Sequence, residues 1–410
     1  MILVAELNSG TYSIANFYER RARRILPALF VMLAVTLPLA YGFLNPADLR
    51  AYAKSLLGAV LFMANVTSYM QSGYFDAASD IKPLMHLWSL AIEEQYYVFF
   101  PVLLAFLWRF KRGHVWAVVL LVSALSLLIA ELKLNKDVST AFFYLHSRAW
   151  ELGVGALLAL TAHAASQQQC KLEIPRNIRQ ALAAMGLVLI VYAIVVFDKT
   201  TRFPGVSALV PTVGAVLVIA FATQETLAGR LLASRAMVGV GLLSYSAYLW
   251  HQPIFAFTRY QSPNHLDQSV LLGLIVLTMA IAFVSWRFVE APFRDKFRVT
   301  RKTIASLSLV GMALFSAIAV VTNAKDGFPE RYPKEFASAF DPYKVKEGKF
   351  CDFKKINGFD DLDFCEFGDT TSKVTLLLYG DSHASSLLGE LDEEFKKTKD
   401  QGATCALVTL

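Results

Sequence analysis

Charged residues are scarce in this chain of 410 residues, where Asp, Glu, Lys and Arg make up 18% against about 25% in an ordinary soluble domain. Hydrophobic residues make up 55%, and the shortage of charge is concentrated in long apolar stretches. These stretches cover residues 25–44, 115–130, 181–197, 206–222, 269–286 and 303–322. Because about 20 helical residues cross the apolar core of a bilayer, the pattern excludes a soluble globular protein and predicts an all-α polytopic membrane bundle.

Cysteine is also rare, with four residues in the chain. Cys351 and Cys365 bracket a polar loop in the C-terminal tail and are candidates for a disulfide in an oxidising periplasm. The alternative, in which all four cysteines are unpaired packing residues, stays open. The first five residues are apolar but too short for a signal peptide. No internal repeat, low-complexity tract or metal site is expected.

The two regions of the chain differ in charge. From Asn323 onward there are 12 Lys and Arg against 17 Asp and Glu; the whole chain carries +6, so residues 1–322 carry +11. We therefore predict a membrane domain over 1–322, a periplasmic linker over 323–372 and the start of a soluble α/β domain over 373–410. Basic residues that flank membrane helices orient the protein, and no nucleic-acid partner is expected.

The distribution of basic residues predicts the topology. Four loops (109–114, 163–179, 224–235 and 287–302) and the segment "ERRARR" hold 18 Lys and Arg, whereas the loops between them hold eight. This split follows the positive-inside rule only if residues 55–71 form a segment that does not cross. We therefore predict nine spans and one non-crossing segment, with the C-terminal domain outside the cytoplasm.

Ionisable side chains at membrane depth are costly and therefore mark candidate functional sites. His86 and Glu93 lie seven positions apart on one helical face, whereas Glu94 points about 100° away. Two further helices carry the candidate pore residues Arg148, Glu151, Tyr248 and His251. Three such helices together predict a polar cavity. The alternative is mutual pairing between helices, worth about 0.6 kcal/mol for each contact.

Four arginines, Arg20, Arg21, Arg23 and Arg24, lie at the cytoplasmic end of the first long apolar segment. One interpretation is an anchor that orients the helix in the membrane. The other is a phosphate-binding cluster, because planar guanidinium groups bind phosphates in a bidentate manner. The residues alone leave both interpretations open.

The tail contains "TLLLYGDSHASSLLGEL", residues 375–391, which predicts a buried strand followed by a tight turn and a helix. In hydrolases the nucleophilic serine lies on such a turn between a strand and a helix, and Ser382 has this position. His383 is adjacent to Ser382 on the turn, and neighbouring residues on a tight turn rarely place an imidazole on the hydroxyl. His383 is therefore not expected to be the base.

The segments "FYERRARRILPAL", "HLWSLAIEEQYYVFFP", "SRAWELGVGALLA", "LSYSAYLWHQP" and "WRFVEAPFR" resemble, in order and spacing, the acyltransferase-3 family of membrane acyltransferases. "LLLYGDSHASSL" resembles the first block of an SGNH hydrolase domain fused behind it. The resemblance implies transfer of an acyl group, commonly acetyl, from cytoplasmic acyl-CoA to an extracytoplasmic glycan such as O-antigen, peptidoglycan or an exopolysaccharide. It implies a multi-pass protein of the bacterial inner membrane. It also implies donor binding by Arg21 and Arg24 and transfer through His86, Glu93 and Glu94.

The chain departs from both families at its ends. The acyltransferase family carries roughly two further helices before "FYERRARR", with a histidine in the first, and the hydrolase family needs later blocks that supply its base. No histidine follows His383, so we expect both ends to be truncated and Ser382 of this chain to be unreactive toward a fluorophosphonate. Two rival hypotheses are a polytopic solute transporter and an inactive remnant of the acyltransferase.

Overall fold

A computed structural model describes residues 2–73, 78–110, 112–167, 174–198, 200–262 and 266–332, and four strands between Lys354 and Thr409. The chain divides into two compact units. The first comprises Met1–Leu44 and Asp48–Ala324, and the second comprises Asn45–Ala47 and Lys325–Leu410.

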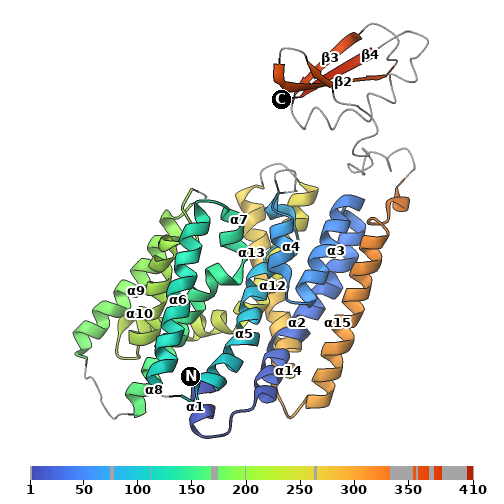
Figure 1. Cartoon of the computed structure of the whole chain (residues 1–410). Helices are drawn as coiled ribbons and strands as arrows, with labels where there is room; N and C mark the ends of the chain where they lie inside the picture. Colours follow the sequence, from blue (N-terminus) through green and yellow to red (C-terminus); the bar gives the residue numbers. More distant parts are fainter. Residues whose placement is uncertain are drawn as a thin grey trace. The chain divides into compact units, whose positions relative to one another are not determined.

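The first unit is a bundle of helices (Figure 1). Its described residues include helices at all nine predicted spans: α2 (Ile14–Phe43), α5 (Leu87–Leu107), α6 (Arg112–Leu134), α8 (Leu145–Gln167), α9 (Arg176–Val196), α10 (Leu209–Phe221), α12 (Arg235–Gln261), α13 (Gln268–Ser285) and α15 (Arg301–Ala324). Shorter elements connect them: α1 (Ile2–Asn8), α3 (Pro46–Val60), α4 (Ala64–Met70), η1 (Ser79–Ile81), α7 (Val138–Phe143), η2 (Val206–Ala208), α11 (Leu227–Leu232), the π-helical segment η3 (Trp286–Glu290) and α14 (Ala291–Arg294).

Six helices in the described part of the chain are long and apolar enough to cross a membrane. They are Ile14–Phe43, Leu87–Leu107, His114–Leu134, Arg176–Val196, Gln268–Arg294 and Arg301–Ala324. The prediction of a multi-pass membrane protein is therefore confirmed. The other three predicted spans are helical, but α10 is short and α8 and α12 carry polar stripes, so the count of nine crossings stays a prediction.

Residues 46–70 fold back on themselves instead of forming one long helix. α3 and α4 meet at a turn where Phe62 adopts a positive φ of 54° and the Met63 N–H donates to the Gly58 carbonyl at 2.7 Å. Across this hairpin the Ser55 hydroxyl donates to Gln71 Oε1 at 3.3 Å. Both ends of the hairpin therefore lie together, which agrees with the predicted non-crossing segment.

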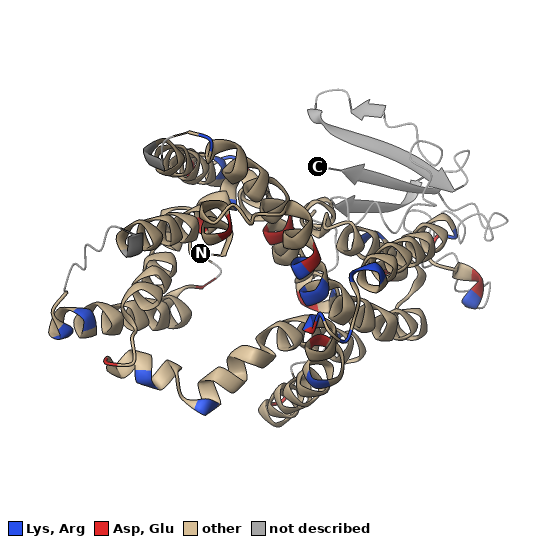
Figure 2. Cartoon of the chain, turned by 90° about the horizontal axis from the view of Figure 1, so that it is seen from below, with Lys and Arg blue, Asp and Glu red and all other residues tan. Residues whose placement is uncertain are grey.

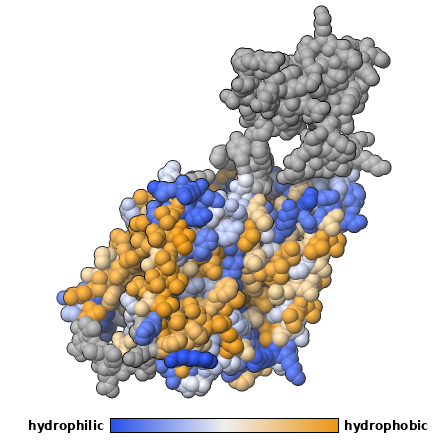
Figure 3. Space-filling view, viewed as in Figure 1, coloured by the Kyte–Doolittle hydropathy of each residue, from blue (hydrophilic) through white to orange (hydrophobic). Residues whose placement is uncertain are grey.

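The outer surface of the first unit is apolar. Figure 3 shows hydrophobic residues in a band across the helices, with hydrophilic residues gathered toward its two ends. Ile194 and Val195 on α9 are each 75% exposed, as expected for side chains that contact lipid. α9 packs closely on α10, because a Cβ at Gly186 would lie 2.7 Å from the Gly214 carbonyl oxygen.

The second unit contains one described sheet of four strands in the order β1-β2-β4-β3. The strands are β1 (Lys354–Ile356), β2 (Phe359–Gly368), β3 (Val374–Gly380) and β4 (Thr404–Thr409), and the short helical turn η4 (Pro329–Arg331) precedes them. β2 is antiparallel to both β1 and β4, whereas β3 is parallel to β4.

The sheet confirms two predicted strands and corrects one expectation. β3 covers the strand predicted before Ser382, and β4 covers the apolar end of the chain. Residues 354–368 were expected to be loop and linker, and this was wrong, because they form β1 and β2. Ser382 and Cys351 lie outside the described residues, so the nucleophile and the pairing of Cys351 with Cys365 stay predictions.

Candidate active site

The polar residues at membrane depth are centred on α5. His86 lies immediately before this helix, and Ser89, Glu93 and Tyr97 follow at helical spacing on the same face. Eleven residues of α-helix rise about 16 Å, so these side chains form a stripe along roughly half of the predicted span. We call His86, Ser89, Glu93 and Tyr97 the α5 stripe.

The arginines of α2 approach the middle of α5, around Glu94 and Tyr97. α2 begins after Ser13, whose hydroxyl accepts a hydrogen bond from the Asn16 N–H at 3.4 Å. Arg21 forms an ion pair with Glu94, and its guanidinium carbon lies 3.8 Å from the centre of the Tyr97 ring. Arg21 of α2 therefore holds both Glu94 and Tyr97, the last residue of the α5 stripe.

The four arginines differ in their surroundings. The Arg20 guanidinium lies 3.0 Å from the Glu6 carboxylate of α1. Arg23 is buried, with a 5% exposed side chain, and donates to Glu19 at 2.8 Å and to the Val299 carbonyl at 2.8 Å.

Arg24 is exposed and, among the described residues, makes no hydrogen bond or ion pair. Its charge nevertheless acts on the carboxylates of Glu93, Glu94 and Glu290. Within the described part of the chain, Arg24 is thus the one of the four arginines whose guanidinium is free to bind a ligand beside the carboxylates of α5.

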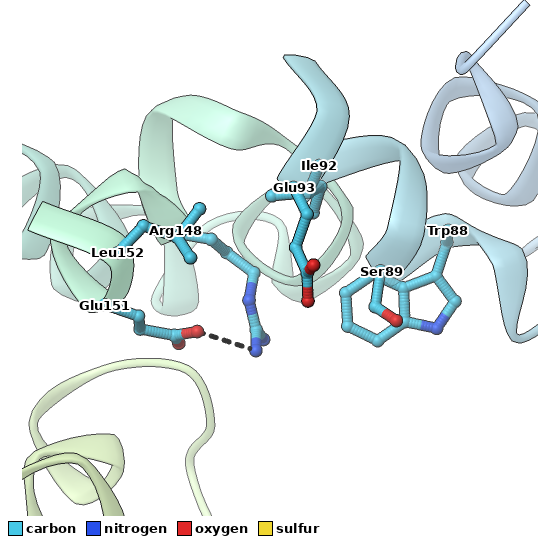
Figure 4. A pocket seen from close by; sticks show the side chains of 7 residues that line it. All are labelled: Trp88, Ser89, Ile92, Glu93, Arg148, Glu151 and Leu152. Atoms are coloured by element: carbon cyan, nitrogen blue, oxygen red, sulfur yellow. Dashed lines mark hydrogen bonds and ion pairs between the residues drawn. The ribbon is translucent and has the colours of Figure 1, made fainter. Parts of the chain in front are cut away.

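A cavity of about 140 Å³ opens between α5 and α8. Its lining residues are Trp88, Ser89, Ile92, Glu93, Arg148, Glu151 and Leu152. Figure 4 shows the Glu93 carboxylate between the Arg148 guanidinium and the Ser89 hydroxyl. The predicted meeting of the stripes on α5 and α8 thus occurs in the structure, whereas the roles of these residues stay predictions.

Arg148 is fixed by one carboxylate and by aromatic rings. It donates to Glu151 Oε2 at 3.1 Å, and its guanidinium carbon lies 5.1 to 5.4 Å from the centres of the Trp88, Phe142 and Phe203 rings. Within the part of the chain that the structure describes, Arg148 Nη1 and Glu151 Oε1 are buried without hydrogen-bond partners. One donor and one acceptor are therefore left unused at this cavity.

α12 joins the site through Tyr248. The Tyr248 hydroxyl lies 3.0 Å from the Ser89 hydroxyl and donates to the His86 carbonyl at 2.6 Å. The His86 ring packs edge-to-face against His251, with 5.2 Å between ring centres. The cavity is therefore linked by Ser89 and Tyr248 to a pair of histidines.

His86 is buried and, among the residues described, neither of its ring nitrogens has a hydrogen-bond partner. The Nδ1 of His251, by contrast, contacts the Tyr248 carbonyl at 2.7 Å. A buried imidazole with two unengaged nitrogens can accept and return a proton, which His251 Nδ1 cannot do without releasing its partner.

Sequence reasoning assigned no role to two residues near this site. Trp88 forms a wall of the cavity; in the sequence it is an aromatic residue two positions after the candidate His86. Glu290 is 2% exposed, accepts from Ser246 at 3.1 Å and pairs with Arg294 at 3.2 Å. The sequence marked Glu290 only as an ionisable residue within the segment "WRFVEAPFR".

The fold and the site together define a multi-pass membrane protein with ionisable side chains that meet inside its helical bundle. A family model described as "Acyltransferase domain" matches residues 2–287. The chain therefore belongs to the acyltransferase-3 family, and the assignment to a class of membrane acyltransferases is confirmed.

Three relatives from Staphylococcus aureus illustrate the similarity. O-acetyltransferase OatA is 29% identical over 339 residues, which cover 78% of this chain and 55% of OatA. One putative O-acetyltransferase is 26% identical over 415 residues, covering 95% of this chain and 67% of that protein. Another is 29% identical over 301 residues, covering 70% of this chain and 49% of that protein. The chain thus spans about half to two thirds of these relatives, and no solved structure matches it.

Proposed function

We propose that this chain is a membrane O-acetyltransferase that moves an acetyl group from cytoplasmic acyl-CoA to a hydroxyl of an extracytoplasmic glycan. The main support is the row of polar groups along α5. Arg21 contacts Glu94 and Tyr97, and Ser89 at the cavity reaches Tyr248 beside the two histidines. Burying such groups inside an apolar bundle costs free energy, so their presence there indicates a function.

The proposed orientation places the arginine cluster in the cytoplasm. α1 and α14 lie at the same end of the bundle (Figure 1), and Lys and Arg are spread over the helix ends seen from that side (Figure 2). A reporter fused after Gly229 should therefore report cytoplasm, and one fused after Lys136 should report the outside. If the reporter after Gly229 lay outside and the one after Lys136 lay in the cytoplasm, the arginine cluster would be on the other side of the membrane from cytoplasmic acyl-CoA.

The donor site is proposed at Arg21 and Arg24. Acyl-CoA carries several phosphate oxygens, which guanidinium groups bind through charge-assisted hydrogen bonds. Arg24 is exposed and unengaged among the described residues, so it can bind a phosphate without breaking an existing contact. Arg20 pairs with Glu6 and buried Arg23 pairs with Glu19, and both serve mainly to hold α2 in place. Arg21 pairs with Glu94 and would exchange this partner for a phosphate when the donor binds.

The chemistry is a transfer from sulfur to oxygen. The acceptor oxygen attacks the thioester carbonyl carbon while His86 removes the hydroxyl proton, so a C–O bond forms and the C–S bond breaks. The thiolate of coenzyme A leaves and takes the proton from His86. The products are the O-acetyl ester and free coenzyme A, and the imidazole returns to its neutral form. The immediate acceptor is either a sugar hydroxyl or a carrier that passes the acetyl group onward.

Transfer of label from radioactive acetyl-CoA in membrane vesicles tests this proposal. His86→Asn should lower the rate by about 100-fold or more, because general base catalysis contributes about 10²–10⁴. His114→Asn provides the matched control, since His114 is exposed at the start of α6. Normal transfer by the His86 variant would exclude this histidine as the base.

A separate role is proposed for the tail. β3 runs parallel to β4, and parallel strands need a crossover connection, which supports the start of an SGNH-type α/β domain with Ser382 after β3. In such a domain the serine would receive or transfer the acetyl group outside the membrane. Labelling of the 410-residue chain by a fluorophosphonate, abolished in Ser382→Ala, would contradict the expectation that its base is lacking.

A further inference from the structure

The cavity between α5 and α8 has features that identify its occupant. Its volume is about 140 Å³, close to the roughly 150 Å³ cavity that accommodates one benzene molecule. One six-membered ring fits such a space, whereas coenzyme A does not. The part of a substrate that enters this cavity is therefore about the size of one ring.

The unused hydrogen-bonding groups point to hydroxyls. Among the described residues, Arg148 Nη1 is a donor without an acceptor, and Glu151 Oε1 is an acceptor without a donor. Glu93 also makes no hydrogen bond or ion pair there. Adjacent hydroxyls on a sugar ring both donate and accept, so they satisfy the guanidinium and the carboxylates together. A thioester or an acetyl group only accepts, and leaves the carboxylates unsatisfied.

The charge of the cavity selects against anions. Two carboxylates, Glu93 and Glu151, face one guanidinium, Arg148, so these lining residues carry one net negative charge when all three groups are ionised. A phosphate or a sugar carboxylate placed there is repelled, and this repulsion is strong in a membrane interior with little water. Trp88 adds an apolar wall on which the C–H face of a sugar ring can pack.

We infer that Trp88, Glu93, Arg148 and Glu151 form a subsite for a neutral pyranose ring of the acceptor, and that the two carboxylates exclude acidic sugars. This inference rests on the proposed function, which it makes specific for the acceptor. The Ser89 hydroxyl in the same cavity lies 3.0 Å from Tyr248, which adjoins His86. A ring bound here therefore lies beside Ser89, and the Tyr248 ring next to it packs edge-to-face on the ring of the proposed base His86, with 5.0 Å between ring centres.

Sugar binding can be measured without transfer. The full chain in lipid nanodiscs is titrated with methyl glucoside or with methyl glucuronoside, which has the same ring with a carboxylate, and each dissociation constant is obtained by saturation-transfer NMR. The wild type should bind the neutral sugar at least about tenfold more tightly, since a like charge a few ångströms away costs at least that factor.

Glu151→Gln is the decisive variant. Glutamine keeps an oxygen that accepts from Arg148 and removes the negative charge, and because Glu151 is the ion-pair partner of Arg148, the Tm of the variant is compared with that of the wild type to show that it is folded. We expect this variant to bind methyl glucuronoside about tenfold more tightly than the wild type does, with little change for methyl glucoside. Glu225→Gln is the matched control, because Glu225 pairs with Arg179 at 2.8 Å outside the cavity.

Three results would overturn the subsite: no binding of methyl glucoside, equal binding of both sugars by the wild type, or an unchanged preference in Glu151→Gln. These outcomes differ from a failure of the proposed function. Selective sugar binding without acetyl transfer would support the subsite and remove the transferase. Acetyl transfer without selective sugar binding would support the transferase and remove the subsite.

Discussion

Replacing Arg23 and Arg24 separately by lysine distinguishes a structural arginine from a ligand-binding one. Both residues belong to the same run of four arginines, yet Arg23 is 5% exposed and Arg24 is exposed. Lysine keeps the positive charge of either residue but loses the planar guanidinium with its several donors. The orienting effect of the charge on the membrane helix is therefore unchanged in both variants.

The expected cost at Arg23 follows from its hydrogen bonds. Its guanidinium donates to Glu19 at 2.8 and 2.9 Å and to the carbonyls of Val299 at 2.8 Å and Phe293 at 3.4 Å. A lysine can keep the contact with Glu19 but leaves a buried carbonyl without its donor, at about 1–3 kcal/mol. With the loss of the second bond to Glu19, we expect Arg23→Lys to destabilise the protein by about 2–4 kcal/mol.

Thermal unfolding of the detergent-purified protein measures this effect. At about 2–4 °C for each kcal/mol in a domain of 150–250 residues, Arg23→Lys should lower Tm by at least several degrees. Arg24→Lys should leave Tm unchanged, because Arg24 makes no hydrogen bond or ion pair among the described residues. Arg230→Lys, on the exposed face of α11, controls for a general effect of the substitution.

The donor assay gives the complementary result. Arg24→Lys should raise the KM for acetyl-CoA about fivefold to tenfold with kcat unchanged, which is the pattern for loss of uniform binding. Arg23→Lys should leave the KM of the folded protein unchanged. A destabilised Arg24 variant with a normal KM, beside a stable Arg23 variant with a raised KM, would refute the assignment.

Two further predictions concern packing and pH. Gly186→Ala should lower Tm, because its Cβ would lie 2.7 Å from a backbone carbonyl of α10, whereas Gly273→Ala should not, because nothing lies within 4 Å; equal effects in unfolding scans would contradict this. Hydrogen bonds from Thr140, first from its side chain, hold the pKa of Asp137 below the usual 3.8. Ionised Asp137 thus stabilises the fold at pH values above the unfolded pKa. The Tm of the wild type should exceed that of Asp137→Asn there, and this difference should disappear as the pH falls through the lower folded pKa. A difference in Tm that stays constant down to a pH of about 2 would contradict the prediction.

Much of the bundle could be predicted from the sequence because lipid imposes one simple rule. Each apolar segment of sufficient length has to be helical, and helices occur at all nine predicted spans among the described residues. The fold-back at Phe62 was predicted indirectly, since a crossing at residues 55–71 would have inverted the distribution of basic loops. The turn between α3 and α4 agrees with this prediction, and the non-crossing topology itself stays a prediction.

The roles of the arginines could not be predicted because their partners are distant in sequence. Arg23 is buried by a segment that lies about 270 positions away, and no local pattern announces that contact. The strands β1 and β2 were missed for a different reason. Residues 354–368 are rich in charge, and the short alternation around Leu362 and Phe364 was too brief to outweigh the polar composition.

The charged residues of the spans are best interpreted by asking which of them are paired. Glu94 pairs with Arg21, and Glu290 pairs with Arg294, which reduces the cost of burying these charges. Among the described residues Glu93 has no such partner, and His86 has two unengaged nitrogens. A membrane protein that retains unpaired polar groups at a cavity bears a cost in stability, and a substrate that supplies the missing partners explains why they persist. Missing partners therefore single out Glu93 and His86 among the described residues, a distinction that the spacing of residues along α5 cannot make.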